Sequence, residues 1–128
     1  MSNDYCTTAN INQIFGPDNV SEWADLNNND VANEIAAQIA WAIDVASDEI
    51  DDYLRSTHHQ IPLITAAGAT PASITDLAAT LAGVRLYENR GVEEMHDGQP
   101  VHKLLWARQR VEKALADIVA GSRRLDAI

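Results

Sequence analysis

The sequence predicts an all-α fold: a small helical bundle with one long central helix, two further helices and one or two short N-terminal helices. Three observations predict it. Apolar residues recur at helical spacing along most of the chain, no β-type alternation extends beyond a few residues, and Gly and Pro fall between the periodic segments. With 128 residues, the chain is expected to form a single domain over residues 1–128.

The N-terminal quarter predicts two short helical segments. Thr7 or Thr8 can cap a first helix, which Gly16 and Pro17 end. A second short turn covers about residues 20–26 and carries Trp23.

The longest helix is predicted over roughly residues 31–55, because no Gly or Pro occurs between Pro17 and Pro62. The cluster at residues 27–30 supplies turn and cap residues in front of it. The expected apolar face consists of Ile35, Ile39, Ala42, Ala46, Ile50, Tyr53 and Leu54. The expected outer side carries Asp44, Asp48, Asp51, Asp52 and Arg55.

Two more helices follow a loop over residues 56–72. The first is expected to open at Ser73, with Asp76 completing a capping box, and to end near Asn89. Its stripe is Ile74, Leu77, Leu81 and Val84, and small residues at 78, 79, 82 and 83 would let another helix approach closely. After a polar connection at 93–98, the last helix is expected from Pro100, in its first turn, to Ala120, with Gly121 as C-cap. Its expected stripe is Val101, Leu104, Leu105, Val111, Leu115, Ile118 and Val119.

Two tryptophans lie outside the apolar faces of their helices. At about 100° per residue, Trp41 points away from the stripe of the long helix, among acidic side chains. Trp106 lies on a mixed face of the last helix, with Lys103, Arg110, Lys113 and Asp117. Large aromatic side chains outside the core face indicate a second buried surface, most simply a subunit contact.

Two arginines interrupt apolar stripes and therefore require partners. Arg85 and Arg108 would need carboxylates if buried, and Glu49 and Glu88 are the best placed. Such pairs are either a buried or inter-subunit salt bridge that fixes helix register, or an anion pocket of a small all-α enzyme. We favour the first, since nothing else completes a catalytic set, and we count Arg85, Arg108 and Glu49 with Trp41 and Trp106 as candidate interface residues.

Little else in the chain suggests chemistry. The four histidines form no ligand pattern, Cys6 has no surrounding nucleophile motif, and there is no glycine-rich phosphate loop. Asp44, Asp48 and Asp52 recur once per turn and predict a solvated acidic face rather than a cation site. We expect no catalytic residue, no cofactor and no metal.

The net charge of −10 disfavours both phosphate neutralisation on nucleic acid and binding to an anionic membrane. No apolar run approaches the roughly 20 residues of a membrane span, and the N-terminus lacks the features of a signal peptide. A single cysteine fits a reducing compartment. These features predict an intracellular protein, acidic toward its N-terminus and more basic in its C-terminal third.

The order of these features resembles a family of tailed-phage structural proteins. It runs from Tyr5-Cys6-Thr7 and Phe15-Gly16, through the segment 46–54 (ASDEIDDYL) and the Pro62-Leu63 loop, to 81–87 (LAGVRLY), 110–115 (RVEKAL) and 118–121 (IVAG). In this order the chain is similar, over about residues 5–125, to phage Mu gp36-like proteins and related head–tail connector (adaptor) proteins. The turn at 27–29 and the loop at 65–70 depart from the pattern, so contacts through them cannot be carried over.

The resemblance implies a non-enzymatic virion protein of the neck, made in the host bacterial cytoplasm. Connectors of this kind assemble as a homo-oligomeric ring, commonly of twelve, beneath the portal protein. They join the portal to the next neck or tail-completion protein and extend the DNA channel, through which the genome passes without specific binding. Within this single connector-type domain, Asp44, Asp48 and Asp52 are candidate channel-facing residues. Residues 122–128, with Arg123, Arg124, Leu125 and Ile128, are a candidate docking tail for the portal or neck.

Two other functions stay open from the residues alone. One is a small helical cytoplasmic regulator or adaptor that acts as a dimer. The other is the small all-α enzyme built around Arg85, Arg108 and Glu49. The closed ring of the first hypothesis requires head-to-tail contacts between unlike faces, whereas the regulator requires a two-fold contact.

Overall fold

The computed structural model describes residues 4–57, 59–90, 94–96, 99–101, 104–121 and 125. Within these residues it contains five helices and one two-stranded hairpin, so the all-α prediction is confirmed with a small addition. The elements are α1 (Thr8–Phe15), α2 (Pro17–Ala24), α3 (Ala32–Leu54), α4 (Ala72–Arg90), β1 (Glu94–His96), β2 (Gln99–Val101) and α5 (Leu105–Ala120).

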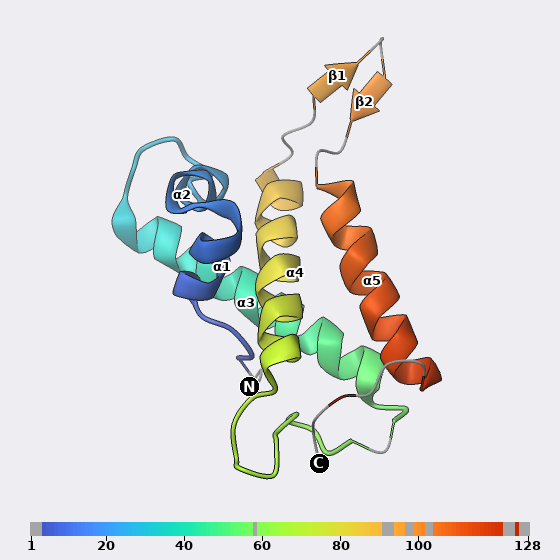
Figure 1. Cartoon of the computed structure of the whole chain (residues 1–128). Helices are drawn as coiled ribbons and strands as arrows, with labels where there is room; N and C mark the ends of the chain where they lie inside the picture. The colour runs from blue at the N-terminus through green and yellow to red at the C-terminus, as the bar shows by residue number, and fades with distance from the viewer. Residues whose placement is uncertain are drawn as a thin grey trace.

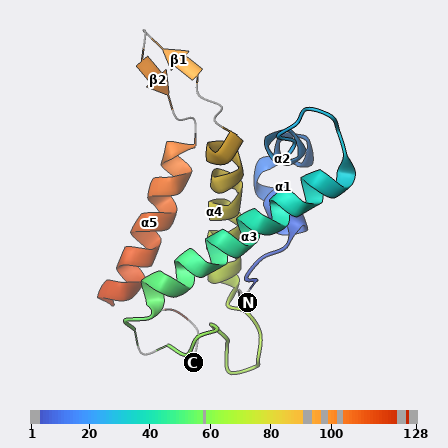
Figure 2. The same ribbon diagram turned by 180° about the vertical axis from the view of Figure 1, so that it is seen from behind.

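Helix α4 forms the centre of the bundle (Figure 1). It packs against all four other helices. α5 runs beside it on one flank, α1 and α2 lie on the other flank, and α3 crosses it on a third side, as Figure 2 shows from behind. The small residues predicted to permit close approach lie at these contacts, since Ala78, Ala79 and Ala82 are fully buried.

Gly83 of α4 is required by a neighbouring aromatic ring. A Cβ atom at this position would lie 2.1 Å from Cε2 of Phe15, far inside van der Waals contact. The close neighbour is thus the ring at the end of α1 rather than another helix backbone. The ring of Phe15 in turn meets Trp23 edge-on at 5.5 Å, and Trp23 meets Tyr87 of α4 at the same centroid distance. These three rings attach α1 and α2 to α4.

The short N-terminal helices form for local reasons that the sequence shows. Thr7 caps α1 through a capping box with Asn10, whose backbone N–H donates to the Thr7 hydroxyl. Gly16 ends α1 with φ of 89°, a conformation that only glycine adopts without strain. Pro17 then occupies the first turn of α2.

The turn before α3 is capped differently from the expectation. The N-cap is Val31, which offers no side-chain acceptor. The carboxylate of Asp25 accepts instead from the backbone N–H groups of Asn29 and Asp30. Asn28 and Asp30 have positive φ angles of 52° and 54°, which Asn and Asp tolerate better than other side chains.

The start of the last helix was predicted too early. Pro100 belongs to β2, where it is paired with Met95 of β1, and α5 begins only at Leu105. Proline has no backbone N–H to donate. Both a first helical turn and the free edge of a strand leave that position without a hydrogen bond, so both can accommodate Pro100. The hairpin stands beyond the ends of α4 and α5, at the opposite end from the 56–71 loop (Figures 1 and 2). The predicted C-cap is confirmed, with Gly121 left-handed at φ of 82°.

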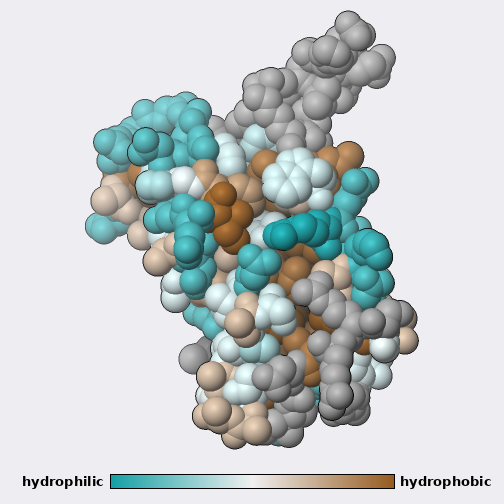
Figure 3. Space-filling model, in the orientation of Figure 1, coloured by the Kyte–Doolittle hydropathy of each residue, from teal (hydrophilic) through white to brown (hydrophobic). Residues whose placement is uncertain are grey.

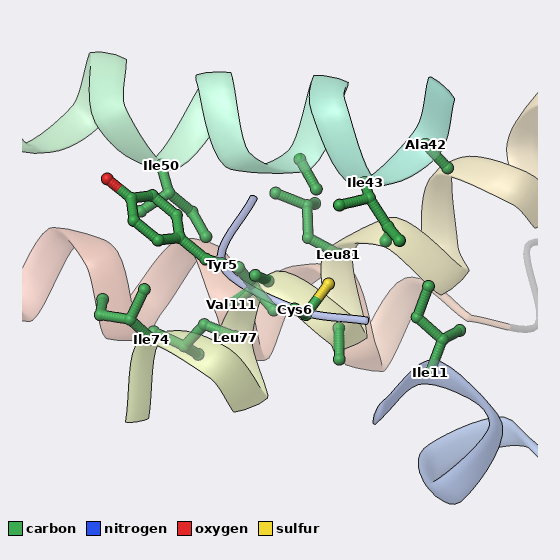
Figure 4. Packing of buried hydrophobic residues seen from close by; sticks show 14 of the residues in the cluster. Tyr5, Cys6, Ile11, Ala42, Ile43, Ile50, Ile74, Leu77, Leu81 and Val111 are labelled. Atoms are coloured by element: carbon green, nitrogen blue, oxygen red, sulfur yellow. The ribbon is translucent and has the colours of Figure 1, made fainter. Parts of the chain in front are cut away.

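The segment before α1 is part of the core. Tyr5 and Cys6 are both buried, and Figure 4 shows them between Ile43 and Ile50 of α3 and Leu77 of α4. The Tyr5 hydroxyl donates to the Asp51 carboxylate and accepts from the backbone N–H of Leu63, at 3.0 Å. The backbone N–H of Tyr5 donates to the Ser47 hydroxyl at 3.2 Å.

This segment corrects two expectations for α3. Asp51 was predicted on the outer side but is only 2% exposed, because the Tyr5 hydroxyl and the start of the chain cover it. Tyr53 was predicted on the apolar face, yet it is among the exposed large hydrophobic residues. The remainder of the predicted face is confirmed in outline, since Ile39, Ala42, Ala46, Ile50 and Leu54 are all buried.

Candidate subunit-interface surfaces

Trp41 lies at the surface, in the N-terminal half of α3, with 41% of the residue exposed. It forms one wall of a shallow pocket of about 370 Å³. The other walls come from the end of α2, the turn that follows it and the preceding helical turns of α3: Ala24, Leu26, Asn27, Glu34, Ala37 and Gln38. We call this pocket the Trp41 groove. Leu26, an apolar residue beside a run of asparagines, is 46% exposed at its edge and was missed from the sequence.

Trp106 lies in the first turn of α5 and is 61% exposed, the highest value among the large hydrophobic residues described. Leu105 beside it is 46% exposed. Leu105 and Val119 were both predicted in the buried stripe of α5, and both are exposed. The helix buries instead the narrower face of Ala107, Val111, Ala114, Leu115 and Ile118. We call Leu105 and Trp106 the Trp106 knob.

Figure 3 shows the distribution of hydrophobic and hydrophilic side chains on one face of the molecule. Hydrophilic side chains cover the region of the α2–α3 turn and the outer side of α5. Hydrophobic side chains reach the surface between these regions, over α4, and near the end of α5 that adjoins the hairpin. This end of α5 carries the Trp106 knob.

The two predicted arginine pairs are present, and both lie within one chain. Arg85 Nη2 is 2.7 Å from Glu49 Oε2, which joins α4 to α3. Arg108 Nη1 is 2.7 Å from Glu88 Oε1, which joins α5 to α4, and Arg108 Nε is 3.1 Å from Glu112. All three of Arg85, Arg108 and Glu49 retain a quarter to a third of their side-chain exposure. Each guanidinium therefore faces a carboxylate of the same chain, as expected of ion pairs that fix the register of the helices.

The acidic row of α3 is exposed as predicted. Asp44, Asp48 and Asp52 all lie at the surface, along the same side of the helix as Trp41 but toward its C-terminal end. Asp4, before α1, joins this row. Its pKa is raised by partial burial, by a hydrogen bond with Asp44 and by the negative charges of Asp44 and Asp48.

Of the four residues proposed for the docking tail, only Leu125 is described. It is 6% exposed and belongs to the hydrophobic core cluster. In this conformation the Leu125 side chain therefore packs into the bundle rather than being offered to a partner. Arg123, Arg124 and Ile128 lie outside the described residues.

The charges divide the molecule sharply along the sequence. Residues 1–54 contain eleven acidic side chains and no Lys or Arg, so this part of the chain, chiefly α2, α3 and the segments around them, carries the whole net negative charge. All nine Lys and Arg residues fall between 55 and 128, together with eight acidic residues. The Trp41 groove belongs to the first part and the Trp106 knob to the second.

The described residues provide few groups with unusual reactivity. Burial, reinforced by the charge of Asp4, raises the pKa of Cys6 to about 12, so its thiol stays protonated at neutral pH and is a weak nucleophile. No cluster of three or more potential metal ligands occurs among the residues that the structure describes. None of the helices in those parts of the chain is long and apolar enough to cross a membrane.

Fold and surfaces together define a small helical bundle whose exposed aromatic side chains lie on two separate flanks. Comparison with protein families matches the chain, over residues 5–127, to the family described as Bacteriophage Mu, Gp36. The chain belongs to this family, which places it among bacteriophage proteins and confirms the resemblance noted from the sequence. No curated protein and no solved structure matches it.

Proposed function

We propose that this protein is a head–tail connector of a tailed phage, located in the virion neck. It assembles as a ring beneath the portal protein and joins the portal to the next neck or tail-completion protein. The observation that carries the proposal is the family match over residues 5–127. The exposure of Trp41 and Trp106 on different flanks supports it, because a ring requires two unlike contact surfaces on each subunit.

The arrangement of helices suits such a subunit. α2 and the start of α3 lie on one flank of α4, and α5 lies on the other flank, in both views of the molecule (Figures 1 and 2). A head-to-tail neighbour can therefore contact each flank without obstructing the other. A ring of twelve, as the family resemblance implies, repeats this contact twelve times.

The acidic row on α3 fits a surface that lines or borders the DNA channel. Asp44, Asp48 and Asp52 are exposed, and an acidic wall would repel DNA phosphates and let the genome slide past. In this proposal DNA passes through the ring without specific binding.

The decisive experiment is to mix the purified chain with the portal protein of the same phage and to image the complexes. We expect a closed ring on one end of the portal, with subunit number readable from top views. A chain that stays monomeric and never associates with portals would contradict the proposal. A stable two-fold dimer indifferent to the portal would favour a cytoplasmic regulator instead.

A further inference from the structure

We infer that the Trp106 knob of one copy inserts into the Trp41 groove of the next copy, and that this pairing is the repeated contact of the ring. The inference rests on the proposed function, since it identifies the contact surfaces of that assembly. The molecule that would fill the Trp41 groove is a second copy of this chain. Three observations carry the inference: complementary shape, complementary charge and position on opposite flanks.

The shapes of the two surfaces are complementary. The groove is an open concavity of about 370 Å³ with an indole along one wall and Ala24, Leu26 and Ala37 among its other linings. The knob consists of two apolar side chains in adjacent positions, Trp106 and Leu105, which are 61% and 46% exposed. An indole entering the groove would meet the Trp41 ring and apolar side chains, which is the environment in which tryptophan contributes most to an interface.

The charges around the two surfaces are also complementary. The groove carries Glu34 and lies within residues 1–54, which contain no basic side chain. Glu34 accepts hydrogen bonds from the Asn27 and Asn29 amides, which hold its carboxylate at the rim. One and two turns after Trp106, α5 presents Arg110 and Lys113, with side chains 51% and 78% exposed, and each also forms an ion pair within its own chain, with Asp76 and Asp117. Opposite potentials would orient the two copies as they meet.

The two surfaces cannot meet within one chain. Helix α5 lies on one side of α4, and α2 with the turn that leads into α3 lies on the other side in both views (Figures 1 and 2), while the rest of α3 crosses α4 to contact α5. A knob that enters a groove on another copy leaves that copy's own knob free for the next one. The contact is therefore heterologous and propagates, which a self-complementary pairing of two Trp41 surfaces would not do.

A mixing experiment with two variants tests this polarity. Trp41→Ala damages the groove and keeps the knob, whereas Trp106→Ala does the reverse. We expect each variant alone to self-associate about tenfold or more weakly than the parent chain. An equimolar mixture should form heterodimers that grow no further, because each dimer keeps one damaged groove and one damaged knob. Tyr53→Ala and Val119→Ala, which truncate exposed residues elsewhere on α3 and α5, are the matched controls.

Cross-linking tests the pairing directly. We would replace Ala37, in the groove, and Gln109, one turn from Trp106, by cysteine in the same chain. Mild oxidation should give a ladder of disulfide-linked oligomers, while either single replacement should give at most dimers. Native Cys6 adds little background because it is buried and its thiol is protonated.

The outcomes separate this inference from the proposed function. Rings on the portal that give the ladder, and that Trp106→Ala disrupts, would support both. Rings that form normally with both tryptophan variants and give no ladder would overturn the knob-and-groove contact and leave the connector function intact. A chain that gives no ladder and never binds portals would overturn both. Circular dichroism of each variant verifies that the monomer is folded.

Discussion

Tyr5 joins three segments that lie far apart in the sequence. Its side chain is buried between α3 and α4, and its hydroxyl contacts Asp51 of α3 and the backbone of Leu63 in the following loop. Burial and the hydrogen bond to the Asp51 carboxylate raise the pKa of Tyr5. The folded state therefore retains the phenolic proton at pH values where the unfolded chain begins to lose it. This contribution to stability is complete below about pH 10 and is lost as the pH rises from there through the raised pKa.

Tyr5→Phe should destabilise the fold by about 1–3 kcal/mol, because it removes two buried hydrogen bonds, the one that the hydroxyl donates to the Asp51 carboxylate and the one that it accepts from the Leu63 N–H. Urea denaturation at neutral pH measures the change. Tyr53→Phe is the control, since Tyr53 is exposed, and its effect should stay within about 0.5 kcal/mol. Equal effects of the two substitutions would mean that the Tyr5 hydroxyl contributes nothing.

The contribution of Asp4 to folding stability should change with pH in the opposite direction to that of a salt-bridged carboxylate. Its pKa is raised by burial and by Asp44 and Asp48, so its ionised form is disfavoured in the folded state and its contribution to stability increases as the pH falls through the raised pKa. Asp4→Asn should therefore stabilise the protein slightly at pH 7, by up to about 0.5 kcal/mol at this largely exposed site. The gain should shrink at about 1 M salt, which screens the carboxylates. Thermal denaturation at low salt and at about 1 M salt measures the effect. A lower melting temperature of the Asp4→Asn protein at pH 7 would contradict the prediction.

At the scale of elements, α4 determines the packing of the bundle. It contacts every other helix, and this central position explains why its sequence is rich in Ala and contains Gly83. A larger surface on α4 would push the neighbouring helices outward. Two ion pairs, Arg85–Glu49 and Arg108–Glu88, then fix how α3 and α5 sit against it.

Gly83→Ala sets helix propensity against packing. Propensity alone would stabilise α4 by about 0.5–1 kcal/mol, but the new methyl group would collide with the Phe15 ring. We expect net destabilisation of about 1–3 kcal/mol, as in other overpacked cores, measured by urea denaturation. Combining it with Phe15→Leu should recover part of the loss. A stabilised Gly83→Ala protein would show that the ring moves aside freely.

The ion pair between Arg85 and Glu49 should contribute to the folding stability of the monomer. A double-mutant cycle with Arg85→Ala and Glu49→Ala should give a coupling energy of about 0.5–1 kcal/mol, because both side chains are still partly solvated. The cycle is measured by denaturation at concentrations below self-association. A coupling near zero, with assembly nevertheless impaired, would assign the pair to the subunit interface instead.

The whole molecule is strongly polar in its charge distribution. Residues 1–54 form an acidic side that includes α3, and the later helices are nearly balanced. In head-to-tail assembly the acidic side of one copy faces the part of the next copy that carries all nine Lys and Arg residues, rather than another acidic side. Self-association should therefore weaken as salt rises from about 0.15 M toward 1 M, which sedimentation can follow. Association that strengthens with salt would indicate a purely apolar contact.

The channel proposal belongs to the same scale. Reversing Asp44, Asp48 and Asp52 to Lys should slow DNA ejection or reduce the amount of DNA packaged, because the wall would then attract phosphates. Phages carrying Asp18→Lys and Glu22→Lys on α2 provide a control at a different exposed acidic site. Unchanged packaging and ejection with all three reversals would contradict a channel-facing α3.

The sequence alone determined the helical class, the principal helices and both arginine–carboxylate pairs, because these depend on periodicity, capping residues and the need of a guanidinium for a partner. It also identified Trp41 and Trp106 as exposed. Only the tertiary structure decided the burial of Asp51, since a hydrogen bond from a residue 46 positions away leaves no local signal. The hairpin that contains Pro100 depends on the pairing of two strands, which likewise leaves no local signal in the sequence. The Trp41 groove likewise exists only where the turn after α2 folds back beside α3, and so no periodicity in the chain could have revealed it.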